Sequence, residues 1–171
     1  MSFVIIGNKL DHIKHGIYIS NWNSAIDEKL LKEHNIKAVL CINNVAKQKH
    51  ELKIYDKLGI HHYQIDADDL EHVDLKRWFE KTNSIIEWYV ARDMPIVVHC
   101  TAGISRSVTV VLAYLIYLTH CRGTKRPGKP IIHRLYKWLR TKRDQALPNP
   151  GFYNQLIKFE LECLEESKKD N

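Results

Sequence analysis

Cysteine is rare in this sequence of 171 residues, and no long apolar run occurs. The four cysteines, Cys41, Cys100, Cys121 and Cys163, are dispersed without a CxxC pair, which excludes a disulfide scaffold and indicates a reducing compartment. No segment approaches the ~18 apolar residues that a membrane-spanning helix needs, and residues 1–14 lack the charge order of a signal peptide. The sequence therefore predicts a cytoplasmic protein, with the nucleus as an alternative, and no membrane span.

Glycine and proline are also scarce, at seven and five residues, and no repeat, low-complexity tract or linker divides the chain. The hydrophobic fraction of 44% is that of an ordinary globular protein, which excludes disorder as the main description. A chain of this length is long enough to bury one core. We therefore expect a single domain over residues 1–171.

One segment lacks acidic residues altogether. Nine of the 26 Lys and Arg residues lie between Arg122 and Arg143, so the rest of the chain carries 17 basic against 20 acidic residues. The formal charge of +6 is therefore a local surplus rather than a property of the whole chain. A solvated helix face and a contact surface for an acidic or polyanionic partner both fit this pattern, and the sequence leaves the choice open.

Short apolar or alternating segments predict strands, and longer segments with helical spacing predict helices. We expect strands over residues 3–6, 16–20, 36–42, 60–65 and 95–99. We expect helices over residues 23–33, 48–58, 75–89, 108–118, 131–143 and 152–164. Because helices and strands alternate, the fold class is α/β with a largely parallel sheet, and functional side chains are expected at the carboxyl ends of its strands.

The segment with most chemical content lies between the last apolar strand and the helix after it. Cys100 stands where that strand ends, and mostly small residues follow it up to Ser107. Gly103 allows the backbone to curl, so that successive N–H groups can surround a phosphate next to a helix N-terminus. Arg106 can grip two phosphoryl oxygens, and a cysteine in this setting is expected to ionise at neutral pH. The alternative for Cys100 is a small buried hydrophobic residue.

The pattern of His99 and Cys100, five intervening residues, then Arg106 and Ser107 resembles the signature of the cysteine-dependent protein tyrosine phosphatase superfamily. The HCTAGISRS string is most similar to the dual specificity branch of that superfamily. Further similarities lie at residues 16–19, 24–25, 113–116, 148–152 and 155–156. The likeness thus covers a core over about residues 16–164 and implies a central, mostly parallel sheet of about five strands flanked by helices.

The resemblance also assigns roles to the residues of this loop. It implies that Cys100 is the nucleophile and that Ser107 stabilises its sulfur as the leaving group of a second step. The phosphate would be held by the loop residues, namely Thr101, Ala102, Gly103, Ile104, Ser105 and Arg106. His99 would support the loop through buried hydrogen bonds, and Asn149, in the matching Pro-Asn turn, would brace it from behind. Neither step of such a mechanism requires a metal ion or another cofactor.

A proton donor for the leaving oxygen is needed as well. Acidic residues crowd the turn after the strand at residues 60–65, and position alone leaves the choice open among Asp66, Asp68, Asp69, Glu71 and Asp74. In similar phosphatases the acid lies four residues beyond the strand, which implies Asp69 rather than Asp68. Glu71 and Asp74 are instead expected to be solvated or to cap the following helix.

The function that the resemblance implies is hydrolysis of phosphotyrosine and phosphoserine or phosphothreonine in protein substrates. The basic segment motivates an alternative, a phosphatase of RNA 5′ ends or of phosphoinositides, and keeps nucleic acid open as a partner. The uncharged loop residues oppose it, since they lack the lysines or the His-Gly-Asn pattern of those relatives. A non-catalytic phosphate-binding module is a third hypothesis, which conflicts with the presence of Cys100, Arg106 and an acidic residue.

Two further patterns suggest binding sites and are rejected. Residues 123–129 fit the nucleotide-binding pattern G-x-x-x-x-G-K, but Pro130 stands where Ser or Thr is needed. The ten histidines show no ligand spacing joined to cysteine or carboxylate, so no metal site is expected. A protective disulfide between Cys41 and Cys100, known in some related phosphatases, stays open because the strand register is unknown.

Overall fold

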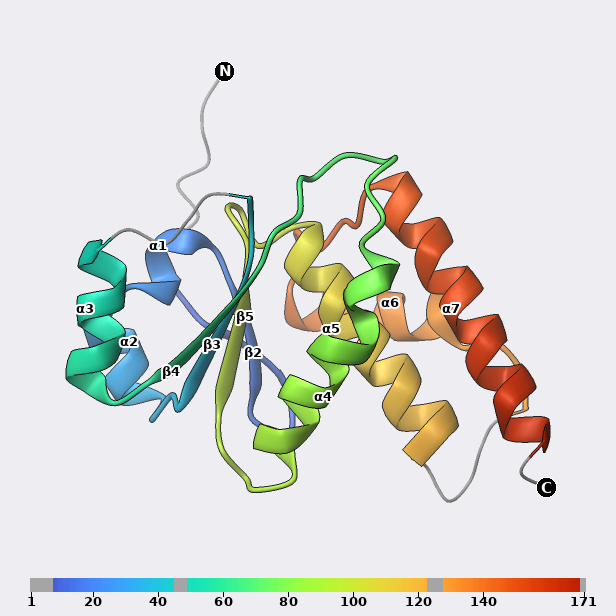
Figure 1. Cartoon of the computed structure of the whole chain (residues 1–171), viewed down its shortest axis with the longest axis horizontal. Coiled ribbons are helices and arrows are strands. Elements are labelled where there is room, and N and C mark those ends of the chain that lie inside the picture. The colour runs from blue at the N-terminus through green and yellow to red at the C-terminus, as the bar shows by residue number, and fades with distance from the viewer. Residues whose placement is uncertain (1–7, 45–48, 123–127, 170–171) are drawn as a thin grey trace.

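A computed structural model describes residues 8–44, 49–122 and 128–169 (Figure 1). Its strands are β1 (Asp11–Lys14), β2 (Ile17–Ser20), β3 (Ala38–Ile42), β4 (His61–Ile65) and β5 (Ile96–His99). Its helices are α1 (Trp22–Ala25), α2 (Glu28–Glu33), α3 (Lys49–Leu58), α4 (Phe79–Val90), α5 (Arg106–Tyr117), α6 (Ile132–Lys142) and α7 (Pro150–Lys169). Two shorter turns are η1 (Lys76–Trp78), a 3₁₀ turn before α4, and η2 (Leu118–Arg122), a π turn after α5.

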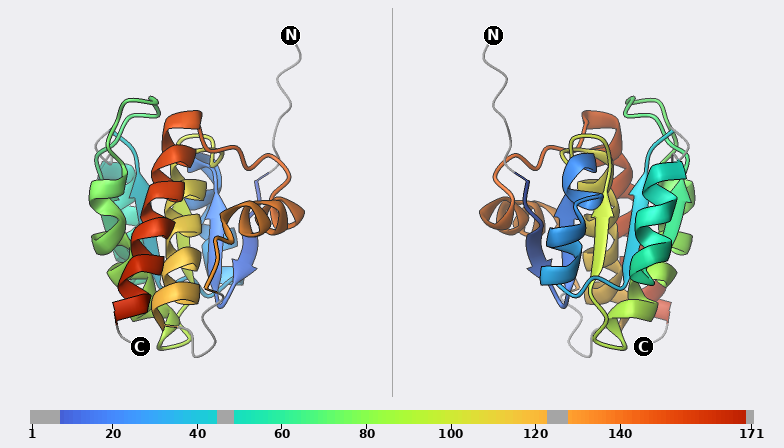
Figure 2. Two further views of the ribbon diagram at one scale, coloured as in Figure 1. Left: turned by 90° about the vertical axis from the view of Figure 1, so that its right-hand side faces the viewer. Right: turned by 90° about the vertical axis from the view of Figure 1, so that its left-hand side faces the viewer.

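The five strands form one sheet in the order β1-β2-β5-β3-β4. β1 and β2 are antiparallel, and the other neighbouring pairs are parallel. Helices α1 to α3 cover one face of the sheet and α4 to α7 cover the other, as the two side views show (Figure 2). The predicted fold class, α/β with a mostly parallel sheet of five strands flanked by helices, is confirmed.

The strands expected from residue 16 onward are all present, and the strand expected at residues 3–6 lies outside the described residues. β1 was not expected, because Ile13 is the one β-branched apolar residue in its four-residue sequence. β1 lies at the edge of the sheet and pairs with β2, a position where polar residues are tolerated.

The single helix expected over residues 23–33 is divided into α1 and α2. The side chain of Asp27 accepts hydrogen bonds from the backbone N–H groups of Lys29 (3.0 Å) and Leu30 (3.1 Å) and so begins a new helix. The apolar spacing continues across this break, which is why the sequence pattern indicates one helix rather than two.

The centre of the sheet is buried on both faces. All residues of β3 and β5 are buried, and α5 is buried along nearly its whole length. β5 lies between β2 and β3, with Ser20 of β2 and Cys41 of β3 in register with His99. The loop that follows His99 therefore begins at the middle of the sheet edge, where rigid strands hold it on both sides.

Candidate active site

Residues 100–106 connect β5 to α5 at the carboxyl end of the central strand. Cys100 is 1% exposed, and its sulfur accepts a hydrogen bond from the backbone N–H of Gly103 (3.2 Å). The hydroxyl of Ser107, in the first turn of α5, lies 3.3 Å from the same sulfur. Both groups can donate a hydrogen bond to the sulfur, so they hold it in place under the loop.

The backbone of this loop turns its carbonyl groups outward. Four consecutive carbonyl oxygens accept hydrogen bonds from groups outside the loop: Thr101 from Trp22 N (3.0 Å), Ala102 and Gly103 from the Arg143 guanidinium (3.3 and 2.6 Å), and Ile104 from Leu147 N (2.9 Å). Because the C=O and N–H of one peptide unit point in opposite directions, the loop N–H groups face inward. The N-terminus of α5 adjoins them, so the loop forms a cradle for an anion above Cys100.

Gly103 is required by two features of this loop. Its φ is +69°, a conformation that residues with a side chain rarely adopt. A Cβ atom here would lie 2.3 Å from the carbonyl oxygen of Ser20 and 2.5 Å from the guanidinium of Arg143. The loop therefore packs this closely on β2 and Arg143 only with glycine at position 103.

Arg106 is 7% exposed, and three hydrogen bonds fix the plane of its guanidinium. Nη1 donates to the side-chain oxygen of Asn43 (3.1 Å) and to the carbonyl oxygen of Ala67 (3.0 Å). Nη2 donates to the hydroxyl of Thr101 (3.1 Å). Nε is buried and has no hydrogen-bond partner within the described ranges. A phosphoryl oxygen held in the loop would supply that partner and satisfy a buried donor.

Two neighbouring aspartates of the acidic segment after β4 are held in different places. The carboxylate of Asp69 accepts hydrogen bonds from the hydroxyl of Ser105 (2.6 Å) and from the side-chain amide of Asn149 (2.8 Å). Asp68 instead accepts a hydrogen bond from the side chain of Asn44. Asp69 is thus the carboxylate tied to the loop, and this geometry favours it over Asp68 as the proton donor.

The start of α7 anchors both the loop and the acidic segment. The backbone N–H of Asn149 donates to the Ser105 hydroxyl (3.0 Å), while its side-chain oxygen caps α7. Gln155 accepts hydrogen bonds from two backbone N–H groups before α4 (2.9 and 2.8 Å). A Cβ atom at Gly151 would lie 2.0 Å from the carbonyl oxygen of Glu71, so glycine permits this close approach. These contacts fix the acidic segment beside the loop.

His99 supports the loop from the opposite end. Its ring nitrogen Nδ1 lies 3.3 Å from the carbonyl oxygen of Cys100, and its ring packs edge-on against Trp22 with the centroids 6.0 Å apart. The backbone N–H of Trp22 also holds the carbonyl group of Thr101. His99 and Trp22 therefore hold the beginning of the loop between β5 and α1.

Arg143 is wrongly placed by the sequence analysis, which assigns it to an exposed basic segment. The residue is 1% exposed, and it forms an ion pair with Asp11 in β1 while it donates to the carbonyl groups of Ala102 and Gly103. The reason is tertiary packing: α6 lies against β1, and the residue that ends α6 is directed under the loop. Arg143 is thus a positioning residue that sequence reasoning missed.

Replacing Arg143 by methionine is expected to lower kcat/KM about 100-fold, because the two carbonyl groups that it holds outward lose their donor and the N–H cradle loses its shape. The change also leaves the buried Asp11 without its arginine, which is expected to reduce the free energy of unfolding by about 3 kcal/mol. Phosphate-ester turnover, the inhibition constant of inorganic phosphate and urea unfolding measure these effects.

The matched control for that change is Arg140→Met, one turn earlier on α6. Arg140 is exposed and donates to the carbonyl oxygen of Asp144, so the turnover of a small aryl phosphate and the inhibition by phosphate should both stay near those of the unchanged protein. If Arg143→Met loses stability but keeps its affinity for phosphate, the arginine supports the fold and does not position the loop.

Residues 8–44, 49–122 and 128–169 contain no group of three or more His, Cys, Asp or Glu side chains arranged to hold a metal ion. Over the same ranges, no helix has both the length and the apolar character needed to cross a membrane. The rejected nucleotide-binding pattern at residues 123–129 falls largely outside the described residues.

The features of the site belong together chemically. The sulfur of Cys100 is buried under a loop whose N–H groups point inward. Arg106 follows the loop, and its Nε has no hydrogen-bond partner among the described residues. Asp69 is held beside the loop by Ser105. On an α/β sheet of this order, such a site defines the class of cysteine-dependent protein phosphatases.

Comparison with known proteins identifies the family. The family model described as dual specificity phosphatase, catalytic domain, matches residues 17–162. The chain is 31% identical over 154 residues to dual specificity protein phosphatase 1B of Arabidopsis thaliana, and the aligned region covers 90% of this chain and 83% of that relative. It is 31% identical over 155 residues to dual specificity protein phosphatase 22 of Homo sapiens, and the aligned region covers 91% of this chain and 76% of that relative.

A solved structure agrees with these relatives. The Yvh1 phosphatase domain from Chaetomium thermophilum superposes on this chain with a TM-score of 0.73 at 28% identity, covering 91% of this chain and 96% of that domain. The chain belongs to the dual specificity phosphatase family.

Proposed function

We propose that this enzyme hydrolyses phosphotyrosine and phosphoserine or phosphothreonine in protein substrates through a cysteinyl-phosphate on Cys100. The observation that carries the proposal is the position of the Cys100 sulfur under the anion cradle, 3.2 Å from the N–H of Gly103. A phosphoryl group bound by the loop N–H groups and by the guanidinium of Arg106 would present its phosphorus to that sulfur.

In the first displacement, the Cys100 thiolate forms a bond to phosphorus while the bond between phosphorus and the substrate oxygen breaks. Asp69 gives its proton to that oxygen, which leaves as a neutral hydroxyl of tyrosine, serine or threonine. The contacts of Asp69 with Ser105 and Asn149 hold the carboxyl group beside the loop for this transfer. The loop N–H groups and the guanidinium balance the charge on the phosphoryl oxygens.

In the second displacement, water attacks phosphorus and the bond to the Cys100 sulfur breaks. Asp69, now a carboxylate, takes the proton of the attacking water. The hydroxyl of Ser107, 3.3 Å from the sulfur, donates a hydrogen bond to the departing thiolate. Inorganic phosphate leaves, and His99 and Asn149 keep the loop in place through both steps.

Protein substrates are favoured by the side chains that border the loop. Leu70 directly follows Asp69 and is 48% exposed. Leu147 is 62% exposed, and its N–H is bound to the carbonyl group of Ile104 in the loop. Exposed apolar side chains suit apolar groups of a protein chain better than the charged backbone of RNA or the headgroup of a phosphoinositide.

A substrate panel tests this assignment. Phosphotyrosyl and phosphoseryl peptides should both be hydrolysed, and at higher kcat/KM than phosphoinositides or 5′-triphosphorylated RNA. A clear preference for RNA or for phosphoinositides would contradict the proposal. It would mean that the basic segment, rather than the apolar side chains of Leu70 and Leu147, binds the substrate. Binding of phosphopeptides without any hydrolysis would support the non-catalytic alternative.

The exposed face of α6 is a proposed contact surface for acidic or polyanionic partners. Its described basic side chains are exposed and come from the α6 segment: Lys129, Arg134, Lys137, Arg140 and Lys142. Arg143 is excluded because it is buried, and the basic residues at positions 125 and 126 lie outside the described residues. Since α6 ends at a residue that touches the loop, this face would attract acidic substrates towards it.

Reversing the charge at Lys129, Arg134 and Lys137 to glutamate is expected to lower kcat/KM for acidic phosphopeptides about tenfold at low salt, with a smaller effect at high salt. Small aryl phosphates should be hydrolysed at an unchanged rate, because they do not reach α6. Steady-state kinetics with both substrates at two ionic strengths measure the difference, and an equal loss on both would mean that the surface is merely solvated.

A cytoplasmic or nuclear location stays a prediction from cysteine usage and composition. The sequence leaves open a disulfide between Cys41 and Cys100. The two residues are not bonded here, and the strand register sets Cys41 beside His99, next to Cys100 in the chain.

A further inference from the structure

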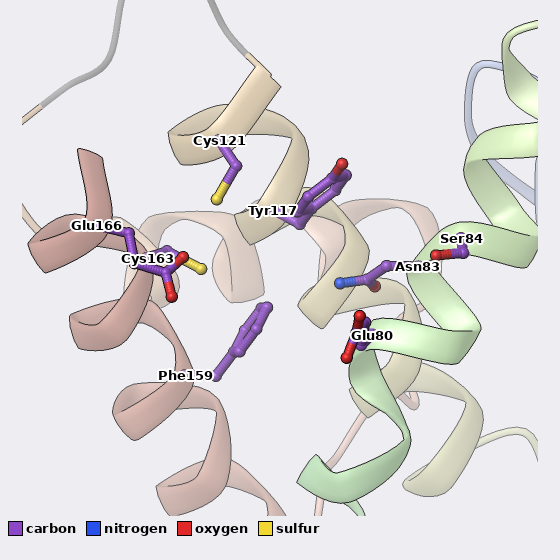
Figure 3. A pocket seen from close by; sticks show the side chains of 8 residues that line it. All are labelled: Glu80, Asn83, Ser84, Tyr117, Cys121, Phe159, Cys163 and Glu166. Atoms are coloured by element: carbon purple, nitrogen blue, oxygen red, sulfur yellow. The ribbon is translucent and has the colours of Figure 1, made fainter. Parts of the chain in front are cut away.

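A pocket of about 530 Å³ lies between α4, the end of α5 and α7 (Figure 3). Two cysteines line it, Cys121 in η2 and Cys163 in α7, together with the rings of Tyr117 and Phe159 and the carboxylate of Glu166. Its lining residues in the described part of the chain all come from α4, α5, η2 and α7. The pocket is therefore separate from the loop of residues 100–106, called the phosphate loop below.

The two thiols in this pocket are direct neighbours. The thiol of Cys163 interacts with that of Cys121. The close view shows both sulfur atoms at the same end of the pocket (Figure 3). The residues are 42 positions apart in the sequence, so the packing of η2 against α7 is what brings them together.

Their surroundings make the two thiols unequal. Cys163 is 3% exposed, and burial raises the pKa of its thiol, as do the negative charge and hydrogen bond of Cys121 and the charges of Glu166 and Glu162. Cys121 is only partly buried. Cys121 is therefore the more accessible of the two thiols, and it is the one that a small oxidant reaches.

We propose that Cys121 and Cys163 form a second thiol site, at which a hydroperoxide is reduced and a disulfide forms between η2 and α7. This reaction goes beyond phosphate-ester hydrolysis and uses none of the residues of the phosphate loop. Its class of oxidant is a small peroxide, because the partly buried Cys121 is open to small molecules through the pocket.

In the first step, the Cys121 thiolate attacks one peroxide oxygen, the O–O bond breaks, and the hydroxide released takes up a proton and leaves as water. Cys121 is then a sulfenic acid and carries no negative charge. In the second step, the Cys163 sulfur attacks the Cys121 sulfur, the S–O bond breaks, and the hydroxide leaves as water with the Cys163 proton. The two thiols lose two electrons, and one hydrogen peroxide becomes two molecules of water.

The disulfide would join the carboxyl end of the α5 segment to α7. α5 begins with Arg106 at the loop, and α7 begins next to Asn149, which is bound to Asp69. A bond between the distant parts of these helices would hold the two supports of the site together. Because it closes a long loop and restricts the unfolded chain, it is expected to raise the Tm by about 5 °C.

The test uses the full chain carrying Cys100→Ser, so that the active-site thiol cannot take part. After treatment with hydrogen peroxide, non-reducing digestion and mass spectrometry should find the peptides of Cys121 and Cys163 joined. The Tm should rise by about 5 °C and return to its first value with dithiothreitol.

Two further variants separate the roles of the two thiols. With Cys163→Ala added, Cys121 should stop at the sulfenic acid, which dimedone traps, and the Tm should not rise. With Cys121→Ser added, Cys163 should stay reduced under the same treatment. Circular dichroism checks the fold of each variant, and Cys163→Val serves if the alanine variant is unfolded.

Three results would overturn the proposal. One is a Cys121 peptide that stays reduced while other thiols are oxidised. Another is a disulfide from Cys121 to Cys41 instead of to Cys163. The third is a Cys121–Cys163 link that forms only after the chain has been unfolded in urea.

Discussion

Cys100→Ser is expected to lower the turnover of every phosphate ester by at least about 10⁴-fold, while the protein keeps its fold and still binds phosphopeptides. The serine hydroxyl does not ionise at neutral pH, so no nucleophile meets the phosphorus. The cradle is otherwise kept, because the outward carbonyl groups of the loop and the guanidinium of Arg106 are held by contacts that do not involve the sulfur. Steady-state kinetics and titration with a fluorescent phosphopeptide measure the two effects.

Cys121→Ser, assayed under reducing conditions, is the matched control for that change. This variant also exchanges a sulfur for an oxygen, but residue 121 lines the pocket between α4, the end of α5 and α7, away from the phosphate loop. Its turnover should match that of the unchanged protein. Residual turnover of Cys100→Ser within about tenfold of the unchanged protein would remove Cys100 from the role of nucleophile.

Asp69→Asn is expected to lower kcat about 100-fold or more for phosphoseryl peptides, whose leaving oxygen needs a proton most. The loss should be much smaller for aryl phosphates with acidic phenols, because such leaving groups depart without protonation. The asparagine can still accept hydrogen bonds from Ser105 and Asn149, so the geometry of the segment is kept. The slope of log kcat against the pKa of the leaving group is the measurement.

Asp68→Asn is the control for the position of the acid. Asp68 is bonded to Asn44 and not to the phosphate loop, so its replacement should leave the dependence on the leaving group unchanged. If Asp68→Asn rather than Asp69→Asn steepens that dependence, the proton donor is one residue earlier than we propose.

The phosphate loop and its flanks can be predicted from the sequence because their information is local. The buried β5 has a short run of apolar residues, the loop after Cys100 is made mostly of small residues, and the apolar α5 follows at once. Gly103 marks the backbone conformation that the loop needs. The proposed nucleophile Cys100, the loop that forms the cradle and Arg106 therefore lie within one short stretch of sequence.

The residues that hold the loop in place are far from it in the sequence, so the sequence pattern does not reveal them. Arg143 pairs with Asp11, which is 132 positions earlier, and nothing near either residue indicates burial. Asn43 holds Arg106 across 63 positions. Its one signal is its place directly after the buried strand β3, at the edge of the sheet where functional side chains gather.

The beginning of α6 shows the same limit. Helical spacing predicts a helix from residue 131, and the structure begins it at Ile132. Ile131, the residue at the N-cap, has an apolar side chain that makes no cap hydrogen bond. Instead the carboxylate of Glu160 in α7 accepts hydrogen bonds from the N–H groups of Ile131 (2.7 Å) and Ile132 (3.1 Å). Glu160 also binds the ring of His120 in η2 (2.8 Å), so this cap exists only once η2, α6 and α7 have packed together.

The central claim is that a phosphoryl group passes through Cys100, and trapping the intermediate tests it most directly. Ser107→Ala should slow the second displacement, because the departing thiolate loses the hydroxyl 3.3 Å from its sulfur. Rapid quenching of that variant with a labelled phosphopeptide, followed by digestion and mass spectrometry, should find one phosphoryl group on the peptide of Cys100, formed and lost at rates that match turnover. A label on any other residue, or steady turnover with no labelled enzyme at any time, would contradict the account.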